Sequence, residues 1–304
     1  MNLSINPSYY CNFNCDFCYL TSEQLKDKNK ISPEKLDELL KQLVQYEKID
    51  HVDLYGGEIM VLPDDYYNDI KKIIKKYYKS KINIITNFSV VDDKLFEDDI
   101  TLSVSYDFEA RQQHDRVFTN IMMSKKPISV LILANKNVID MSVDYMVNML
   151  NMSKNIISVE IKPYSINQSN NHNVSHLDFE NFVKRWLECK TEKKFQFINK
   201  EKIIKSLSKE YNAFSNDHVY ITPNGKFGVL EFDLNDREYF LELNKFEDYL
   251  KWAKLESLTN LSDVCRKCEY YGHCLTEHYR YVKDLDKGCN GYKGLLNYYA
   301  RMEN

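Results

Sequence analysis

Short apolar runs alternate with amphipathic segments along the first half of the chain. The apolar runs have strand length and are rich in Ile, Val, Leu and Tyr, which favours β-structure. We predict strands over 3–9, 51–55, 82–86, 101–105, 128–134 and 157–164. The segments between the strands carry apolar residues at helical spacing, which predicts helices that bury one face.

Helix signals fall between these strands. The first helix begins at Ser32 and Pro33, because serine caps a helix and proline favours its first position. Others are expected from Pro63 and near 111–124 and 143–152. Successive β-then-α units predict an α/β fold with a parallel sheet and helices outside it. Six units favour a partial (β/α)6 TIM-like barrel over a closed eight-stranded one.

A polar stretch at 165–176 then ends this alternation. Helical segments are expected at 178–189 and 200–210. A hairpin is expected from the apolar runs 218–222 and 226–231, which flank a Pro-Asn-Gly turn.

The last part of the chain predicts two further helices, near 246–254 and 292–302. We therefore divide the chain into a barrel core over 1–177, a helical bridge over 178–215 and a small α+β domain over 216–304.

Composition narrows the class of protein. The chain has 304 residues, of which 43% are hydrophobic and 28% charged, as in a soluble globular protein. Its net charge of −4 lacks the basic excess of nucleic-acid binders, so no nucleic-acid partner is expected. We find neither a signal peptide nor an apolar run of about 18 residues, so we expect a cytoplasmic protein without a membrane partner.

The cysteines fall into two groups, which is the strongest chemical signal in the chain. Thiols stay reduced in the cytoplasm, so we expect no disulfides. The grouping of the cysteines instead predicts two metal sites. The first group is Cys11, Cys15 and Cys18; the second is Cys265, Cys268, Cys274 and Cys289; Cys189 stands alone.

The first group supplies three thiolates on one short loop after the first strand. A structural zinc site wants four ligands, and the nearest histidine, His51, lies far along the chain. Three thiolates would instead leave a cubane iron–sulfur cluster with one iron lacking a protein ligand. Phe17, just before the third cysteine, would form an aromatic wall beside it.

This Cys-X3-Cys-X-aromatic-Cys pattern resembles the signature of the radical SAM superfamily. The resemblance implies that Cys11, Cys15 and Cys18 hold a 4Fe–4S cluster whose open iron chelates S-adenosylmethionine. It also implies reductive cleavage to a 5′-deoxyadenosyl radical, which abstracts a hydrogen atom from a substrate.

Gly56, Gly57 and Glu58 end the second predicted strand and are similar to the family's Gly-Gly-Glu motif. The resemblance implies contact with the methionine amino group of the cofactor. Two glycines let a backbone approach a ligand closely, and a carboxylate balances an ammonium. A strand-ending turn explains the same three residues equally well.

Further polar residues follow the third and fourth strands. Ser105 and Asp107 resemble the family's Ser-x-Asp strand end, and Asn87 follows the third strand. The resemblance implies that these residues, together with Arg116, contact the ribose and carboxylate of the cofactor. Ordinary surface or loop polarity is the alternative for Ser105 and Arg116.

Two more sets of residues are candidates for substrate chemistry. Glu160, Lys162 and Tyr164 share one face of the sixth strand and would line a substrate chamber, or form an ion pair that closes the barrel. Cys189 would donate a hydrogen atom to a substrate radical, or is a small buried hydrophobe.

The second cysteine group suits zinc or a 4Fe–4S cluster. Behind a radical SAM core it resembles a SPASM or "twitch" extension, truncated because Leu230 and His278 stand where further cysteines belong. The resemblance implies a C-terminal iron–sulfur domain with one closed auxiliary cluster, hence two 4Fe–4S clusters in all. His278 is a candidate ligand or a surface histidine.

Enzymes of this kind mostly modify ribosomally made peptides by crosslinking, thioether formation or epimerisation. The leading hypothesis is therefore a radical SAM oxidoreductase that acts as a peptide maturase. It would take electrons from a donor such as flavodoxin or ferredoxin. The chain starts at its first strand, so we expect no N-terminal peptide-recognition domain. That favours the alternative, a small-molecule radical SAM dehydrogenase with a single auxiliary cluster. A cluster-binding protein without activity is a third hypothesis.

Overall fold

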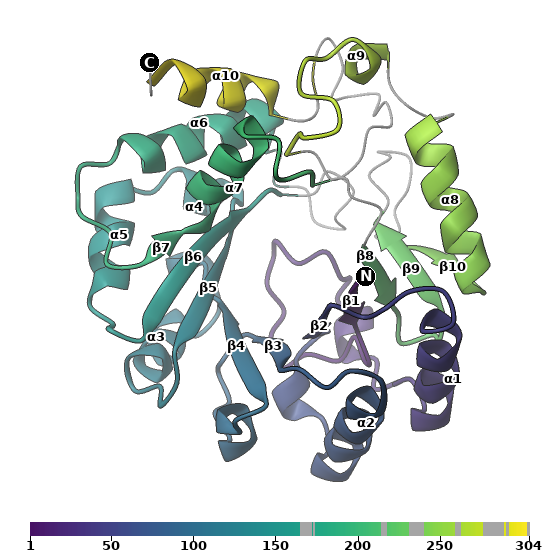
Figure 1. Ribbon diagram of the computed structural model, residues 1–304. Helices are drawn as coiled ribbons and strands as arrows, with labels where there is room; N and C mark the ends of the chain where they lie inside the picture. Colours follow the sequence, from purple (N-terminus) through teal and green to yellow (C-terminus); the bar gives the residue numbers. More distant parts are fainter. Residues whose placement is uncertain are drawn as a thin grey trace.

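A curved sheet with helices on its outer side forms the body of the molecule (Figure 1). The computed structural model describes residues 1–164, 172, 174–213, 218–230, 240–258, 263–275, 289 and 292–302. Within them, ten strands form one sheet in the order β10-β9-β8-β1-β2-β3-β4-β5-β6-β7. No described pairing joins β7 to β10, so the barrel is open, as the sequence predicts.

The six predicted barrel strands are confirmed and lie parallel to their neighbours. The strand β1 ends earlier than expected, because Pro7 has no N–H with which to continue the ladder. The strands are β1 (Asn2–Ile5), β2 (His51–Leu54), β3 (Ile82–Thr86), β4 (Ile100–Ser105), β5 (Ile128–Leu133) and β6 (Ile156–Lys162).

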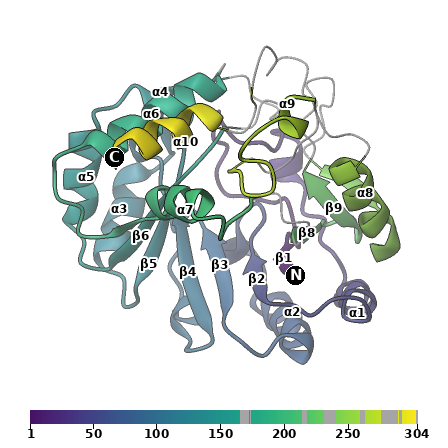
Figure 2. The ribbon, with the colours of Figure 1, turned by 45° about the horizontal axis from the view of Figure 1, so that its top comes forward.

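Helices that follow the strands cover the outer face of this sheet (Figures 1 and 2). Ser32 caps α1 by accepting a hydrogen bond from the Lys35 N–H, and Pro33 takes the first position, as predicted. The helices here are α1 (Pro33–Leu43), α2 (Asp64–Tyr77), α3 (His114–Met122), α4 (Lys136–Ile139) and α5 (Val143–Asn151). Short 3-10 turns are η1 (Gln24–Lys26), η2 (Ile59–Val61), η3 (Asp93–Phe96) and η4 (Phe108–Ala110).

The helices α6 (His176–Glu188) and α7 (Ile198–Leu207) follow β6, and the short strand β7 (Gln196–Phe197) lies between them. A capping box between Ser175 and Asp178 begins α6. Asn199 in the first turn of α7 bonds to both backbone groups of Ile161: its Oδ1 accepts from the N–H at 2.7 Å and its Nδ2 donates to the carbonyl at 2.8 Å. These bonds fix α7 against β6 inside the barrel mouth.

The predicted hairpin forms from β8 (His218–Ile221) and β9 (Phe227–Leu230), and β10 (Phe240–Leu243) extends it. The strand β8 also lies parallel to β1, with Asn2 opposite His218. The sheet thus continues across the boundary predicted at 216, and the buried Val219 and Ile221 join the barrel core. The division into a core, a bridge and a C-terminal domain stays a prediction.

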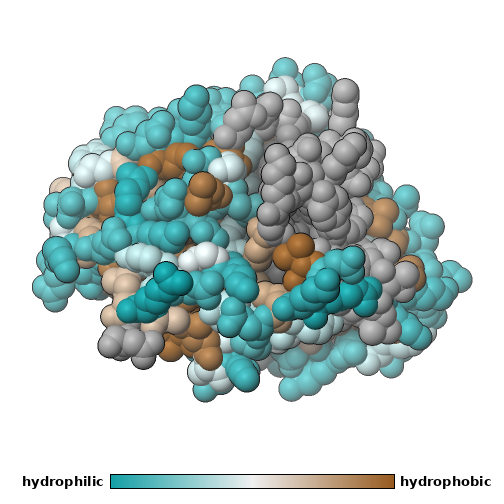
Figure 3. Space-filling view, turned by 90° about the horizontal axis from the view of Figure 1, so that it is seen from above, coloured by the Kyte–Doolittle hydropathy of each residue, from teal (hydrophilic) through white to brown (hydrophobic). Residues whose placement is uncertain are grey.

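Three helices lie in the last part of the chain: α8 (Phe246–Leu258), α9 (Asp263–Arg266) and α10 (Lys293–Met302). The start of α8 packs beside the end of α1, where the rings of Tyr46 and Phe246 lie 5.6 Å apart. The helix α10 contacts α6 and α7. From above, the described residues present mostly hydrophilic side chains with scattered hydrophobic patches (Figure 3). Among them, none of the helices has the length and apolar character to span a bilayer.

Candidate active site

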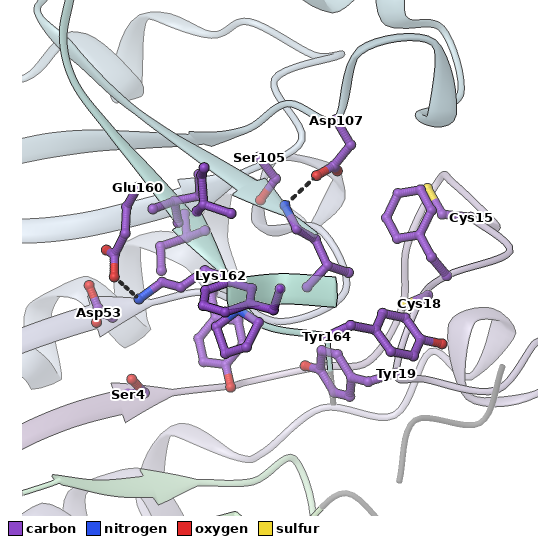
Figure 4. Close-up of a pocket in the computed structure, with 18 of the residues that line it drawn as sticks. Ser4, Cys15, Cys18, Tyr19, Asp53, Ser105, Asp107, Glu160, Lys162 and Tyr164 are labelled. Carbon is purple, nitrogen blue, oxygen red and sulfur yellow. Dashed lines mark hydrogen bonds and ion pairs between the residues drawn. The ribbon is translucent and has the colours of Figure 1, made fainter. Parts of the chain in front are cut away.

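A cavity of about 460 Å³ opens inside the curved sheet. Cys11, Cys15 and Cys18 line it together with residues from β4, β6 and α7. Figure 4 shows Cys15 and Cys18 with Ser105 of β4 and Lys162 of β6. The carboxyl ends of parallel strands meet at this end of a barrel, which is where such folds place their active sites.

The cysteine loop follows β1 and is held by its own backbone and by a distant side chain. The Cys11 N–H donates to the Leu25 carbonyl at 3.0 Å, and the Phe13 N–H donates to the Cys11 Sγ at 3.3 Å. Gln112 brackets Asn14: its Oε1 accepts from the Asn14 N–H at 3.0 Å and its Nε2 donates to the Asn14 carbonyl at 3.1 Å. The loop therefore has a defined shape.

The three thiols fit an iron–sulfur cluster as a donor set. No group of three His, Cys, Asp or Glu side chains in the described part of the chain is arranged around a single metal ion. A cubane binds each thiolate at a different iron, so its ligands need not converge on one point. Burial raises the pKa of Cys11 to about 12 and that of Cys18 to about 11, so these thiols need cations beside them to ionise. Iron would supply that charge.

The two glycines after β2 serve a packing role that the sequence did not reveal. A Cβ on Gly57 would lie 2.1 Å from the Tyr10 carbonyl oxygen, and one on Gly56 would lie 2.5 Å from that of Ser8. The Gly57 N–H donates to the Ser8 carbonyl at 2.9 Å. The glycines thus admit the chain's own segment before the cysteines, although both also line the cavity.

Glu58 is buried, and its carboxylate accepts hydrogen bonds from other residues of the chain. Its carboxylate accepts from the Met60 N–H at 2.9 Å, the Thr86 hydroxyl at 2.7 Å and the Asn87 N–H at 2.7 Å. It does not line the cavity, and burial raises its pKa despite these donors. Its position joins β2 to β3 and gives no support to the expected contact with a cofactor ammonium.

Asn87 and Ser105 line the cavity, and their expected contacts to a cofactor stay a prediction. The Asn87 Nδ2 donates to the Asn12 Oδ1 at 2.9 Å, which connects the end of β3 to the cysteine loop. Its own Oδ1 accepts from the Ser89 N–H at 2.9 Å. Phe17 also lines the cavity, in the position expected of an aromatic wall.

Asp107 lies beyond the end of β4 and is fully buried. Its Oδ1 accepts from the Leu133 N–H at 2.6 Å, and its Oδ2 accepts from the Arg111 Nε at 2.9 Å (Figure 4 shows the first bond). It lines the cavity, but these partners show that it positions Arg111 and the end of β5.

Arg111 is the cavity residue that sequence reasoning missed. Its guanidinium lies 5.5 Å from the Phe17 ring centroid. Burial opposes its charge, but Asp107 and the Cys15 and Cys18 thiolates raise its pKa. The spacing of four residues from Asp107 was its one sequence signal. Arg116, the expected arginine, is exposed on α3 and does not line the cavity.

Glu160, Lys162 and Tyr164 line the cavity together, and Glu160 and Lys162 also form the ion pair of the second hypothesis. A role in substrate chemistry stays a prediction. Cys189 does not line it. It caps the end of α6, and its thiol donates to the Asp144 Oδ1 at 3.3 Å. A hydrogen-atom donor must reach the substrate, so this position gives no support to that role.

Comparison with known proteins assigns the first third of the chain. Residues 5–106 match the radical SAM superfamily. These residues form a radical SAM domain. They include the cysteine loop, the two glycines and the strands β2, β3 and β4. The chain is also 27% identical to an uncharacterized protein of Archaeoglobus fulgidus over 115 residues, which make up 36% of this chain but only 26% of that relative's length.

Solved structures resemble the whole described fold around this radical SAM domain. The structure of anSMEcpe with bound AdoMet has a TM-score of 0.72 at 15% identity, over 100% of this chain and 98% of that one. SuiB of Streptococcus suis bound to precursor peptide SuiA has a TM-score of 0.67 at 16% identity, over 95% and 75%. At such identity the likeness confirms the open-barrel fold.

The second cysteine group lies beyond the radical SAM domain, next to α7. Cys265 and Cys274 are buried, whereas Cys268 and Cys289 are half-buried. The Cys268 N–H donates to the Cys265 carbonyl at 3.0 Å, and the Ala213 N–H, just after α7, donates to the Cys274 carbonyl at 2.9 Å. Residues 276–288, with His278, lie outside the described residues. One cluster shared by the four cysteines therefore stays a prediction.

Proposed function

We propose that this chain is a radical SAM enzyme that modifies a peptide. The observation that carries the proposal is one cavity shared by the three thiols of the cysteine loop and the polar side chains of β6 and α7. Such a cavity places a radical source and a substrate within reach of each other.

The residues present fit a 4Fe–4S cluster and S-adenosylmethionine. When bound, this pair supplies a 5′-deoxyadenosyl radical that abstracts a hydrogen atom. Cys11, Cys15 and Cys18 would hold the cluster. The Arg111 guanidinium would stabilise the thiolates of Cys15 and Cys18, because it lowers the pKa of both against the effect of burial, and its pairing with Asp107 keeps it in place.

The rest of the cavity would orient the cofactor and exclude water. Asn87 and Ser105 present polar groups for the cofactor's ribose and carboxylate, and Gly56 and Gly57 leave the backbone close to it. Phe17 and the ring of Tyr164 are buried and line the cavity, where they would help to exclude water from a bound cofactor.

The peptide part of the proposal is supported by the solved structures. Those of anSMEcpe include one with bound AdoMet and the Cp18Cys peptide, and SuiB is bound to its precursor peptide. Crosslinking, thioether formation and epimerisation all begin with hydrogen abstraction. An electron donor such as flavodoxin or ferredoxin and a cytoplasmic location belong to the same proposal.

We also propose an auxiliary 4Fe–4S cluster on Cys265, Cys268, Cys274 and Cys289, within a C-terminal domain. Two hydrogen bonds between Ser206 of α7 and His273 of this segment support the proposal, because α7 lines the cavity. Four protein thiolates leave no iron open, so this cluster would carry electrons and not bind substrate.

The function is tested by incubating anaerobically reconstituted, reduced protein with S-adenosylmethionine and measuring 5′-deoxyadenosine. The wild type is expected to form it, and Cys15→Ala to fall to background. Cys189→Ala is the matched control, because it removes a cysteine outside the cavity and should retain the wild-type rate. Absence of 5′-deoxyadenosine from the wild type would refute radical SAM activity.

The substrate class is tested by adding a mixed synthetic peptide library or a mixture of sugars and amino alcohols. A peptide-modifying enzyme should form 5′-deoxyadenosine faster with the peptides. Stimulation by the alcohols alone would favour a small-molecule dehydrogenase instead.

A further inference from the structure

Two lysines from different elements converge on one carboxylate in the cavity. The Lys162 Nζ on β6 lies 2.7 Å from the Glu160 Oε1, and the Lys202 Nζ on α7 lies 2.5 Å from the same oxygen. All three residues line the cavity. Because both ammonium groups reach one oxygen atom, they face a common point and another carboxylate oxygen can bridge them in the same way.

The arrangement is held by the backbone and not by the ion pair alone. Asn199 bonds to both backbone groups of Ile161, which lies between Glu160 and Lys162. Lys202 lies three residues after Asn199 on α7. The double contact therefore fixes the backbone positions from which the two lysine side chains extend, which lowers the entropic cost of binding.

The described members of this cluster carry two positive charges and one negative charge. Burial opposes ionisation of Glu160, but the two lysines lower its pKa to about 2, so the carboxylate is charged at neutral pH. The lysine side chains are 42% and 32% exposed, whereas that of Glu160 is 16% exposed. The cations are thus the members of the cluster most open to the cavity.

The Glu160, Lys162 and Lys202 side chains lie apart from the cysteine loop within the cavity. Figure 4 draws Glu160 and Lys162 at one end of the cavity and Cys15 and Cys18 at the other. Asp53 also lines the cavity and has its pKa lowered by His51 and Asn83 against the effect of burial. A second carboxylate nearby disfavours a dianion such as phosphate more than it disfavours a monoanion.

We propose that Lys162 and Lys202 form a carboxylate-binding subsite, which selects a peptide substrate that presents an acidic side chain or its C-terminal carboxylate. This inference rests on the proposed function and names the chemistry of its substrate. Glu160 is a positioning residue in this account, because it draws the two ammonium groups to one point.

The wild type tests the inference without any substitution. Reconstituted protein loaded with S-adenosylmethionine is titrated calorimetrically with N-acetylglutamate N-methylamide and with its neutral glutamine analogue. The acidic side-chain probe is expected to bind roughly tenfold more tightly. N-acetylalanine, which carries only a C-terminal carboxylate, tells the two carboxylate sources apart. If the glutamine analogue binds as well as both acids, or inorganic phosphate binds better than both, the inference is overturned.

Variants assign the preference to the lysines. Lys202→Met should abolish the preference for the acid, and Lys162→Met should do the same. Lys205→Met is the control, because this lysine is exposed on α7 outside the cavity and its loss should change nothing. The affinity for S-adenosylmethionine should stay unchanged in all three. A weakened cofactor affinity in the two cavity variants would overturn the inference, since the lysines would then serve the cofactor.

Two readouts keep this inference apart from the proposed function. Failure of the reduced wild type to form 5′-deoxyadenosine defeats the proposed function, whatever the ligand preference. If 5′-deoxyadenosine forms but the acidic and neutral probes bind equally, the substrate inference alone fails.

Discussion

Gly57 occupies a position where the chain leaves no room for a side chain. The turn after β2 and the segment before the cysteine loop meet there, and a Cβ would lie 2.1 Å from one backbone oxygen and 2.2 Å from another, those of Tyr10 and Tyr9. The sequence predicted a special role for the glycine pair but assigned it to ligand approach. The contact partner is more than 40 residues away, so only the folded chain reveals it.

We expect Gly57→Ala to lower the free energy of unfolding by about 2 to 3 kcal/mol, because backbone must shift to admit the methyl group. The shift would displace the cysteine loop, so the reconstituted variant should also bind less iron. Gly272→Asn is the control for the unfolding measurement alone: asparagine tolerates positive φ, and nothing lies within 4 Å of a Cβ there. Denaturant unfolding and iron content measure both effects; a stable variant with full iron would contradict the packing role.

Arg111 and Arg116 show how closely a residue-level prediction can miss. Both lie shortly after the Ser-x-Asp strand end, where the resemblance led us to expect a cofactor-binding arginine. Arg111 follows Asp107 by four residues, across the turn η4, and the ion pair between them holds the Arg111 side chain at the cavity. Arg116 lies in α3 and is exposed. The conformation of a short connecting turn decided between them, and the sequence pattern does not encode it.

Among the elements, strands and helices of the barrel were predictable because each has its own periodicity and caps. The alternation of buried residues in β5 and the serine cap of α1 are local properties. The pairing of β8 with β1 is not local, because it joins residues more than 200 positions apart. The sequence therefore predicted the hairpin but not its place in the barrel sheet.

The stability of the protein should depend on pH through Glu160, which joins β6 to α7. A carboxylate whose folded pKa of about 2 lies below its unfolded value of about 4.3 stabilises the fold above the unfolded pKa, and that stabilisation is lost as pH falls through the folded pKa. Wild-type stability should thus fall relative to Glu160→Gln from about pH 4.5 toward pH 2. Urea unfolding of both proteins at a series of pH values measures this. Parallel curves would contradict the pairing.

On the scale of the whole molecule, two cysteine groups from opposite ends of the chain lie at one barrel mouth. The first lines the cavity. The segment of the second bonds to the end of α7 through His273 and Ser206, and α7 lines the same cavity. Spacing alone predicted each group, because ligand spacing is local. Their arrangement around a common cavity depends on the continuous sheet and on α7, which carry no cysteine signature.

Cys11, Cys15 and Cys18 should hold a cluster with one open iron for S-adenosylmethionine. The most direct measurement is the electron paramagnetic resonance spectrum of reduced protein that carries Cys265→Ala, Cys268→Ala and Cys274→Ala, so that the auxiliary site keeps one thiolate and holds no cluster, before and after S-adenosylmethionine is added. The account predicts a cluster signal that changes shape on addition, and no such signal when Cys15→Ala is introduced as well. A spectrum unchanged by S-adenosylmethionine, or a signal that persists without Cys15, would contradict it.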